Sequence, residues 1–534
     1  MGIIISLFSI SIFIYLLFRF RPPAGDFFSH SSPPTYPFIG CLLSFYNNRN
    51  RLLDWYTELL SGSASGTIVV RRLGCRRTVV TVNPDNVEYI LTTHFVNFPK
   101  GKPFTEILGD FLGCGIFNVD GELWRTQRKL ASHEFSAKSL QEFVVETLES
   151  EVEMRLLPAL ETSSRDGAVV DLQDLLKRFA FGVICKVVLG SEEETILELE
   201  KSFDVASKVS AGRAMEPVYV IWKVKRWFGV GSEWQLKTAV AEVHRKVKNI
   251  IEKRRERKKM EDLHERKDLL SRLISIGYDD EVIRDMAISF IMAGRDTTSA
   301  AMTWLFWLLS HHPNIQNQLV EEIDLESALR VEQKLDYKSL KELKFLKACL
   351  CETMRMYPPV PWDSKHAIAD DQLPDGTPVQ AGDRVTYFPY GMGRMERLWG
   401  KDWFEFKPSR WLLEPDGRGR RRGVKLVSPY KFPIFQAGPR VCLGKEMAFI
   451  QMKYVVASIL SQFRIKPIAA DHPVFVPLLT AHMAGGFKVL CQRREKEERE
   501  RETANSRQTN KIPNLNNQKK TQVNNSNTEL TDHS

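Results

Sequence analysis

One short segment of the chain combines residue types that could hold a metal ion. Residues Phe435 to Gly444 read Phe-Gln-Ala-Gly-Pro-Arg-Val-Cys-Leu-Gly, so Arg440 lies two residues before Cys442, and a helical pattern follows at Glu446 to Leu460. A cysteine beside a cation and near a helix N-terminus has a lowered pKa, because both stabilise the thiolate. The pattern therefore predicts that Cys442 presents an anionic sulfur as a metal ligand.

The remaining residues of this segment indicate that the metal is part of a flat cofactor. Phe435 could shield one side of the sulfur, and Gly438 and Gly444 could let a flat macrocycle approach the backbone. For an isolated cysteine the alternative is a buried structural thiol followed by an ordinary glycine turn. Here five residues stand at fixed spacing, which favours the metal site over that alternative.

The segment resembles the haem-binding loop of the cytochrome P450 family. This resemblance implies a mainly α fold with a smaller β region, haem b as the cofactor and Cys442 as its axial thiolate ligand. It also implies that Phe435, Gly438, Arg440 and Gly444 contact the cofactor. The expected activity is that of an NADPH- and O2-dependent monooxygenase, which receives its electrons through NADPH-cytochrome P450 reductase.

A long apolar helix is predicted to cross the centre of the domain. Asp279 and Asp280 are suited to begin it, and the pattern runs to Ser310, shortly before Pro313 stops it. About 30 helical residues span roughly 45 Å, which is enough to cross a domain.

Charged residues interrupt this apolar pattern. Arg295 and Asp296 are followed by Thr297, and burying charge is costly, so the cluster needs a reason. A structural ion pair is one explanation. The other comes from the resemblance, because the segment Ala293 to Thr298 is similar to the family's oxygen-activation segment. Its first two residues would leave room above the iron, and Asp296 and Thr297 would order the waters that deliver protons to dioxygen.

Trp124 and Arg128 form a second candidate contact with the cofactor. They lie four residues apart in a helical pattern, so an indole N–H and a guanidinium could reach one anionic group. A surface cation–π pair is the alternative. In the family that the chain resembles, such a pair contacts a haem propionate, and His366 is expected to make a third propionate contact.

Glu352 and Arg355 share one face of a further predicted helix. An E-x-x-R pattern is common on protein surfaces and contributes about 0–1 kcal/mol there. Its position between the threonine-bearing helix and Cys442 is what gives it weight. The resemblance implies a structural triad in which Arg410, within Phe406 to Trp411, completes the pair.

The two ends of the chain differ from its body. Residues 3–18 form an apolar run closed by Arg19 and Arg21, which favours a membrane anchor at 1–20 over a cleaved signal peptide. A proline-rich hinge is predicted at 21–40, the cytochrome P450 catalytic domain at 41–491 and a disordered tail at 492–534. The arrangement predicts a single-pass protein of the endoplasmic reticulum membrane with a cytosolic catalytic domain, in contact with membrane lipid.

Composition fits a reducing compartment and a large folded body. The 534 residues are 43% hydrophobic and carry a net charge of +9, and the eight cysteines show no C-x-x-C pair. Basic runs occur without any base-reading motif, so we expect an acidic redox partner rather than nucleic acid. The segments 67–72 and 78–82 predict a strand pair, and 357–366 and 379–388 are predicted to be extended.

A narrower resemblance concerns the substrate. The segments 98–101, 358–365, 390–395 and 479–486 resemble the plant fatty-acid ω-hydroxylases and the jasmonoyl-isoleucine hydroxylases grouped with them. This implies terminal hydroxylation of a small-molecule aliphatic carboxylate, favouring jasmonoyl-L-isoleucine at its 12 position over a free fatty acid. By analogy, seven residues are expected to line the channel: Phe104, Phe111, Phe117, Val360, Trp362, Leu479 and Thr480.

Two other classes of function remain open at this point. A haem-thiolate isomerase or dehydratase would not need to activate oxygen, and a non-catalytic haem protein would not either. The Asp296 and Thr297 pair favours the monooxygenase over both.

Overall fold

The computed structural model describes residues 32–494, except for 37, 74, 137, 191–192, 217–219, 259–267, 330–334, 414–422 and 470–472. The predicted membrane anchor, most of the proline-rich hinge and most of the predicted tail lie outside the described residues. Within the part of the chain that the structure describes, no helix combines the length and the apolar character needed to cross a membrane.

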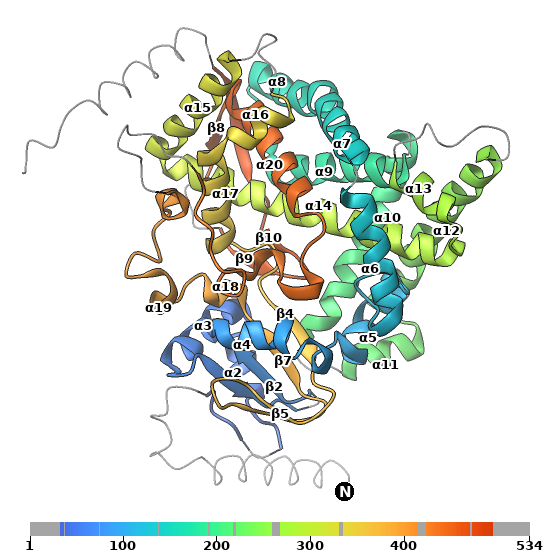
Figure 1. The fold of residues 1–534 in the computed structure, drawn as a ribbon, viewed down its shortest axis with the longest axis vertical. Coiled ribbons are helices and arrows are strands. Elements are labelled where there is room, and N and C mark those ends of the chain that lie inside the picture. The colour runs from blue at the N-terminus through green and yellow to red at the C-terminus, as the bar shows by residue number, and fades with distance from the viewer. Residues whose placement is uncertain are drawn as a thin grey trace, which may run out of the picture.

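The architecture is a large helical body beside a small β region, which confirms the predicted fold class (Figure 1). The helices are α2 (Leu42–Asn47), α3 (Leu52–Gly62), α4 (Pro84–Glu88), α5 (Gly101–Leu112), α6 (Gly121–Ser136), α7 (Lys138–Glu151), α8 (Leu157–Asp166), α9 (Leu172–Leu189), α10 (Glu193–Met215), α11 (Val220–Phe228), α12 (Ser232–Lys258), α13 (Leu269–Ile276), α14 (Asp280–His311), α15 (Pro313–Ala328), α16 (Tyr337–Glu342), α17 (Lys344–Met356), α18 (Pro389–Met392), α19 (Glu396–Trp399) and α20 (Lys445–Leu460).

The strands form four small sheets. They are β1 (Thr67–Val70), β2 (Thr78–Thr81), β3 (Val170–Asp171), β4 (Asp363–His366), β5 (Asp371–Gln372), β6 (Pro378–Val379), β7 (Arg384–Tyr387), β8 (Phe463–Pro467), β9 (Phe475–Pro477), β10 (Ala481–Met483) and β11 (Lys488–Arg493). β11 pairs with β8, and the Arg494 N–H donates to the Gln462 carbonyl at 2.8 Å. The folded body therefore continues slightly beyond the predicted boundary at 491.

Helix α14 runs through the middle of the helical body, as predicted, and ends one residue later than expected (Figure 1). Asp279 has the extended backbone of an N-cap, but its side chain makes no capping bond. α14 packs against α9, α12, α17 and α20. Trp304 of α14 stacks on Tyr357 at 4.0 Å between ring centroids, which fixes α14 against the end of α17.

The largest sheet has the order β1-β2-β7-β4 and brings together segments about 300 residues apart in the chain. β1 and β2 form the predicted antiparallel pair, β7 lies parallel to β2, and β4 lies antiparallel to β7. Only the ends of the two predicted extended segments become strands. Because side chains alternate between faces, two rows of residues share one face of the sheet: Val70, Thr78, Arg384 and His366, and Ile68, Val80, Thr386 and Ser364.

A glycine next to the end of α17 shows how closely these segments pack. A Cβ added at Gly393 would collide with the backbone carbonyl of Arg355. We expect Gly393→Ala to lower the free energy of unfolding by about 1–3 kcal/mol, because backbone cannot yield as a flexible side chain can. Thermal unfolding of the purified protein measures this.

Gly212→Ala is the matched control. No heavy atom lies within 4 Å of a Cβ added at Gly212, which sits inside α10. Alanine favours a helix over glycine by roughly 0.5–1 kcal/mol, so this variant should be slightly more stable. Equal stability of the two variants would contradict the packing argument.

Candidate active site

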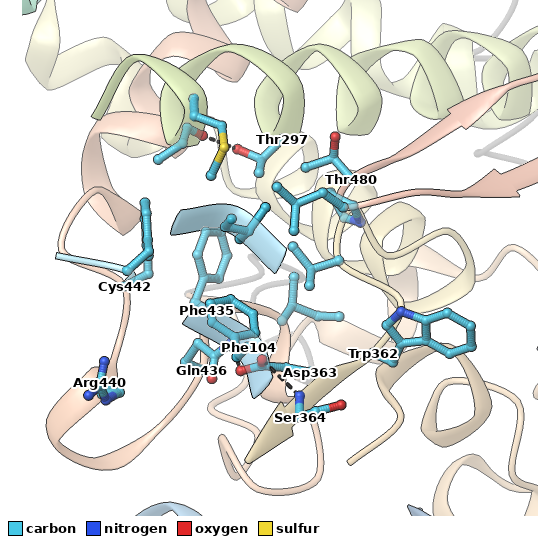
Figure 2. Close-up of a pocket in the computed structure, with 18 of the residues that line it drawn as sticks. Phe104, Thr297, Trp362, Asp363, Ser364, Phe435, Gln436, Arg440, Cys442 and Thr480 are labelled. Carbon is cyan, nitrogen blue, oxygen red and sulfur yellow. Dashed lines mark hydrogen bonds between the residues drawn. The ribbon is translucent and has the colours of Figure 1, made fainter. Parts of the chain in front are cut away.

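A cavity of about 480 Å³ lies between α14, the segment Phe435–Gly444, α5, α6 and the four-stranded sheet. Cys442, Arg440, Thr297 and Phe104 all line it, although they come from distant parts of the chain (Figure 2). The structure thus brings most of the sequence-predicted site residues to one space.

The loop before α20 is built by backbone geometry. The Cys442 N–H donates to the Phe435 carbonyl at 2.8 Å, which closes the loop. Gly438 has φ +62°, and a Cβ there would collide with the Leu91 carbonyl, so this glycine lets the loop pack on the preceding segment. A Cβ at Gly444 would meet no heavy atom within 4 Å. Two glycines were expected to let a macrocycle approach the backbone. Of these, only Gly444 has open space beside it.

Cys442 opens into the cavity, while protein surrounds it on its other sides. Burial raises the pKa of its thiol, and a backbone hydrogen bond at Gly444 and the charges of Arg128 and Lys445 offset this only in part. The predicted lowering by Arg440 is therefore wrong for the protein without a metal. A bound cation would have to supply the rest of the stabilisation of the thiolate.

Arg440 is held by other groups. Its Nη2 donates to Asp120 Oδ1 at 2.6 Å and to the Val119 carbonyl at 3.0 Å, and its guanidinium lies 4.4 Å from the centre of the Trp124 ring. Its Nε is buried without a partner among the described residues. That unpaired donor lies at the cavity, where it is suited to an anionic group.

Trp124 and Arg128 both come from α6 and both line the cavity. Burial lowers the pKa of the Arg128 guanidinium, and no carboxylate among the described residues pairs with it. The alternative, a cation–π pair between Trp124 and Arg128, does not form, since the Arg440 guanidinium lies over the Trp124 ring instead. Arg128 is thus a half-buried cation available to an anionic ligand.

His366 reaches the cavity from β4. Its Nδ1 lies 2.6 Å from the Lys100 carbonyl, so that nitrogen carries the proton, and Nε2 is buried without a partner among the described residues. Burial lowers the pKa of His366 to about 4. The neutral ring presents a lone pair at Nε2, so it can bind a carboxylate there only when it is protonated.

Thr297 and Asp296 lie in different surroundings. Thr297 lines the cavity, and its hydroxyl donates to the Ala293 carbonyl at 2.7 Å. Asp296 is outside the cavity lining and pairs with Arg295 at 2.6 Å. A Cβ at Gly294 would lie 2.6 Å from Ile184 Cδ1, so this glycine makes room for α9, and both Ala293 and Gly294 line the cavity.

Glu352 and Arg355 are fully buried and paired twice at 2.8 Å. Arg410 reaches Glu352 at 3.4 Å, and Trp411 Nε1 donates to the same carboxylate at 2.7 Å. Arg355 also donates to the Trp403 carbonyl at 2.7 Å. The triad does not line the cavity; it fixes the segments that lead into the Cys442 loop.

Sequence reasoning missed a buried charged cluster beside the loop. Asp363 accepts from Lys100 at 2.6 Å and from Lys365, Tyr387 and Gln436 at 2.9 Å each. Burial alone would raise the pKa of Asp363, but Lys100 and Lys365 outweigh it and hold the pKa well below its usual range. Burial lowers the pKa of Lys365 to about 7. The alternation of Asp363 and Lys365 along one strand could have revealed their common face.

One expected channel residue lies elsewhere. Phe111 is fully buried against Phe203, with ring centroids 5.0 Å apart, and belongs to the core. The other six predicted channel residues line the cavity: Phe104, Phe117, Val360, Trp362, Leu479 and Thr480.

The donor set of the cavity fits a haem. The sulfur at Cys442 can serve as the axial ligand, Gly444 leaves open space beside it, and Arg128 and the unpaired Arg440 Nε can receive propionates. Phe435 lies against Phe449 of α20 at 5.3 Å, so its ring is held next to the loop that carries the sulfur.

Comparison with known proteins agrees with this fit. The family model for cytochrome P450 matches residues 31–482. The chain belongs to the cytochrome P450 family. Cytochrome P450 94B1 of Arabidopsis thaliana is 56% identical over 505 residues, which cover 92% of this chain and 98% of that protein. Cytochrome P450 94B3 of the same plant is 56% identical over 471 residues, covering 86% and 92%. Cytochrome P450 94A1 of Vicia sativa is 44% identical over 473 residues, covering 87% and 91%.

This cytochrome P450 is therefore a haem-thiolate monooxygenase supplied with electrons by a reductase. When bound, haem supplies the activation of dioxygen and the insertion of one oxygen atom into a substrate bond. Cys442 would hold the iron through its sulfur, Arg128 and Arg440 would bind the propionates, and the cavity walls would orient the substrate.

The role of Cys442 is open to a direct test. We expect Cys442→Ser to lose the thiolate-type carbon-monoxide spectrum of the reduced protein, because serine cannot provide a thiolate. Cys114→Ser is the control, since Cys114 is exposed and does not line the cavity. Retention of that spectrum by Cys442→Ser would reject the ligand assignment.

The Thr297 hydroxyl is expected to take part in proton delivery to the cavity. In Thr297→Ala we expect haem binding to persist while hydrogen peroxide formed per NADPH rises, because proton delivery is impaired. Thr303→Ala is the control, since the Thr303 hydroxyl makes the same bond within α14, to the Ser299 carbonyl at 2.8 Å, outside the cavity lining. An unchanged peroxide ratio would mean that Thr297 is only structural.

Proposed function

We propose that this cytochrome P450 hydroxylates the terminal carbon of an aliphatic carboxylate. The observation that carries the proposal is the lining of the cavity. Its walls near Thr297 are apolar, yet the described lining residues include seven lysines and arginines and a single carboxylate, that of Asp363. A positive cavity with apolar walls suits a ligand that has an anionic end and a hydrocarbon end.

Terminal hydroxylation needs a cavity that positions the chain end. A primary C–H bond is stronger than the secondary ones beside it, so the protein must hold the terminal methyl at the reacting position and keep inner carbons away. Phe104, Phe117 and Leu479 belong to one apolar cluster and have partly buried side chains that contact the cavity. They can confine a hydrocarbon chain and exclude water from it.

The residues of α14 form the polar part of this end of the cavity. Thr297 Oγ1 donates to the Ala293 carbonyl, which leaves its lone pairs for a water or a proton donor. The pair of Asp296 and Arg295 keeps a carboxylate one residue away, on the side of α14 that faces Asp204. We propose that Asp296 acts through a change of this pairing rather than by direct contact with the substrate.

Jasmonoyl-L-isoleucine, hydroxylated at its 12 position, is the substrate we favour. It carries a carboxylate, an amide and an aliphatic end, and the cavity offers hydroxyl groups from Ser364 and Thr386 in addition to its cations. A free fatty acid has no amide, so it offers these hydroxyls only its carboxylate as a partner. Fatty-acid ω-hydroxylation is the alternative, supported by the same apolar walls.

The expected setting follows from the sequence. We propose that residues 1–20 anchor the protein in the endoplasmic reticulum membrane with the catalytic domain in the cytosol, where NADPH-cytochrome P450 reductase can reach it. The run of apolar residues ending at Arg19 and Arg21 supports this orientation.

A competition experiment tests the function. Equal concentrations of jasmonoyl-isoleucine and dodecanoate are incubated with the protein, reductase and NADPH, and products are resolved by position of the hydroxyl group. We expect terminal products, with the jasmonoyl product in excess. In-chain hydroxylation of both compounds would reject the proposed function, whereas fatty-acid turnover alone would reject only the preferred substrate.

A further inference from the structure

On one face of the four-stranded sheet, the residues that line the cavity are not among the expected haem contacts, except for His366. The two cross-strand rows of this face alternate with residues on the opposite face, as strand geometry requires. All of their members except Ile68 line the cavity. Asp363 and Lys365 point to the other face, toward the Cys442 loop. Asp363 and Lys365 of β4 therefore face the Cys442 loop, whereas Ser364 and His366 of the same strand lie on the opposite face.

Aromatic and apolar side chains complete the walls on this second side. Tyr56 of α3 contacts Trp362 and Phe388, with ring centroids 6.5 and 6.3 Å apart. Phe45 of α2 and Leu52 of α3 also line this part of the cavity. Figure 2 shows Trp362 and Cys442 on opposite sides of the drawn cavity residues, so these walls lie away from the sulfur.

Three arginines converge on this space. Arg72 lines the cavity and its guanidinium stacks on the Phe45 ring at 3.8 Å, where it also contacts Cys75 Sγ at 3.1 Å. Arg76 follows in the same hairpin, and Arg384 projects from β7. Burial lowers the pKa of His366, and the charges of Arg384 and Arg76 lower it further, so these two arginines lie close to the same ring.

The pairing of Arg72 and Arg76 differs from that of the neighbouring Arg77. Arg77 forms an ion pair with the buried Asp383, outside the cavity lining. Arg72 and Arg76, in contrast, pair with no carboxylate among the described residues, and Arg76 donates only to the Gly382 carbonyl at 3.2 Å. Because Arg72 and Arg76 line the cavity without a carboxylate partner among the described residues, they can attract an anionic group of the ligand.

We propose that Arg72, Arg76 and Arg384 form the binding site for the carboxylate of the substrate, at the end of the cavity away from Cys442. This inference rests on the proposed function and adds the residues that set the position of the substrate. With the carboxylate held at this sheet face, the hydrocarbon chain extends past Trp362 and Val360 toward Thr297. The distance between the two ends then selects which carbon is hydroxylated.

The test compares an acid with its uncharged ester. Purified full-length holoprotein is titrated with dodecanoate, methyl dodecanoate and jasmonoyl-isoleucine, and binding is followed by the change in the haem absorption spectrum. We expect wild type to bind dodecanoate more tightly than the ester. In Arg72→Gln/Arg76→Gln, the Kd for both acids should rise on the order of 10- to 100-fold, as loss of hydrogen bonds to a charged group predicts, while the ester is unaffected.

Two further variants keep the test decisive. Arg76→Gln alone changes an exposed side chain, so it should fold normally and still weaken binding of the acids. Arg71→Gln is the matched control, because Arg71 is exposed in the same hairpin and does not line the cavity. The carbon-monoxide spectrum of each variant reports whether haem is retained.

The outcomes separate the inference from the proposed function. Loss of preference for the acid in the arginine variants, with products shifted inward from the terminal carbon, supports the carboxylate site. Reduced haem content, with an unchanged ratio of the acid and ester Kd values in the protein that retains haem, would assign these arginines to a propionate and overturn the inference. Terminal hydroxylation by wild type with identical binding in all variants would overturn the inference and leave the function standing. Failure of wild type to bind or hydroxylate either acid would overturn both.

Discussion

The buried ion pair of Glu352 and Arg355 constrains the structure around the Cys442 loop. Neither side chain has any exposed surface, so each charge must be balanced by direct hydrogen bonds. Arg355 donates to the carbonyls of Gly393, Trp403 and Glu405, and Glu352 accepts from Arg410 and Trp411. A charge that cannot be left unpaired therefore determines where α17 meets the segment that precedes the loop.

The loop carries the second constraint. Its closure by the bond from the Cys442 N–H to the Phe435 carbonyl places the sulfur at the cavity, and Gly438 fixes the loop against the Leu91 carbonyl. Gln436 has φ +62°, an uncommon conformation for a residue with a side chain, and its amide is bound to Asp363 and Tyr387. The charged cluster on β4 thus stabilises the backbone that presents the metal ligand.

Local patterns predicted the elements of this fold better than they predicted contacts. The helix of Thr297, the first strand pair and the helix after Cys442 were all visible as periodicity in the chain. The sequence could not show that Arg440 would pair with Asp120, or that Gly294 would make room for Ile184, because these partners come from distant segments. Phe111 likewise has the apolar aromatic side chain expected of a channel residue. Only its packing against Phe203 shows that it belongs to the core.

The register of β4 has a consequence for how such a protein can diverge. Asp363 and Lys365 face the Cys442 loop, whereas Ser364 and His366 share the opposite face with Thr386 and Arg384. Substitutions at alternate positions can change one environment while the other stays the same. Insertion or deletion of a single residue in this strand would exchange the two faces at once. Related proteins are therefore expected to keep the length of β4 unchanged. The residues at every second position of the strand can differ between proteins that bind different ligands.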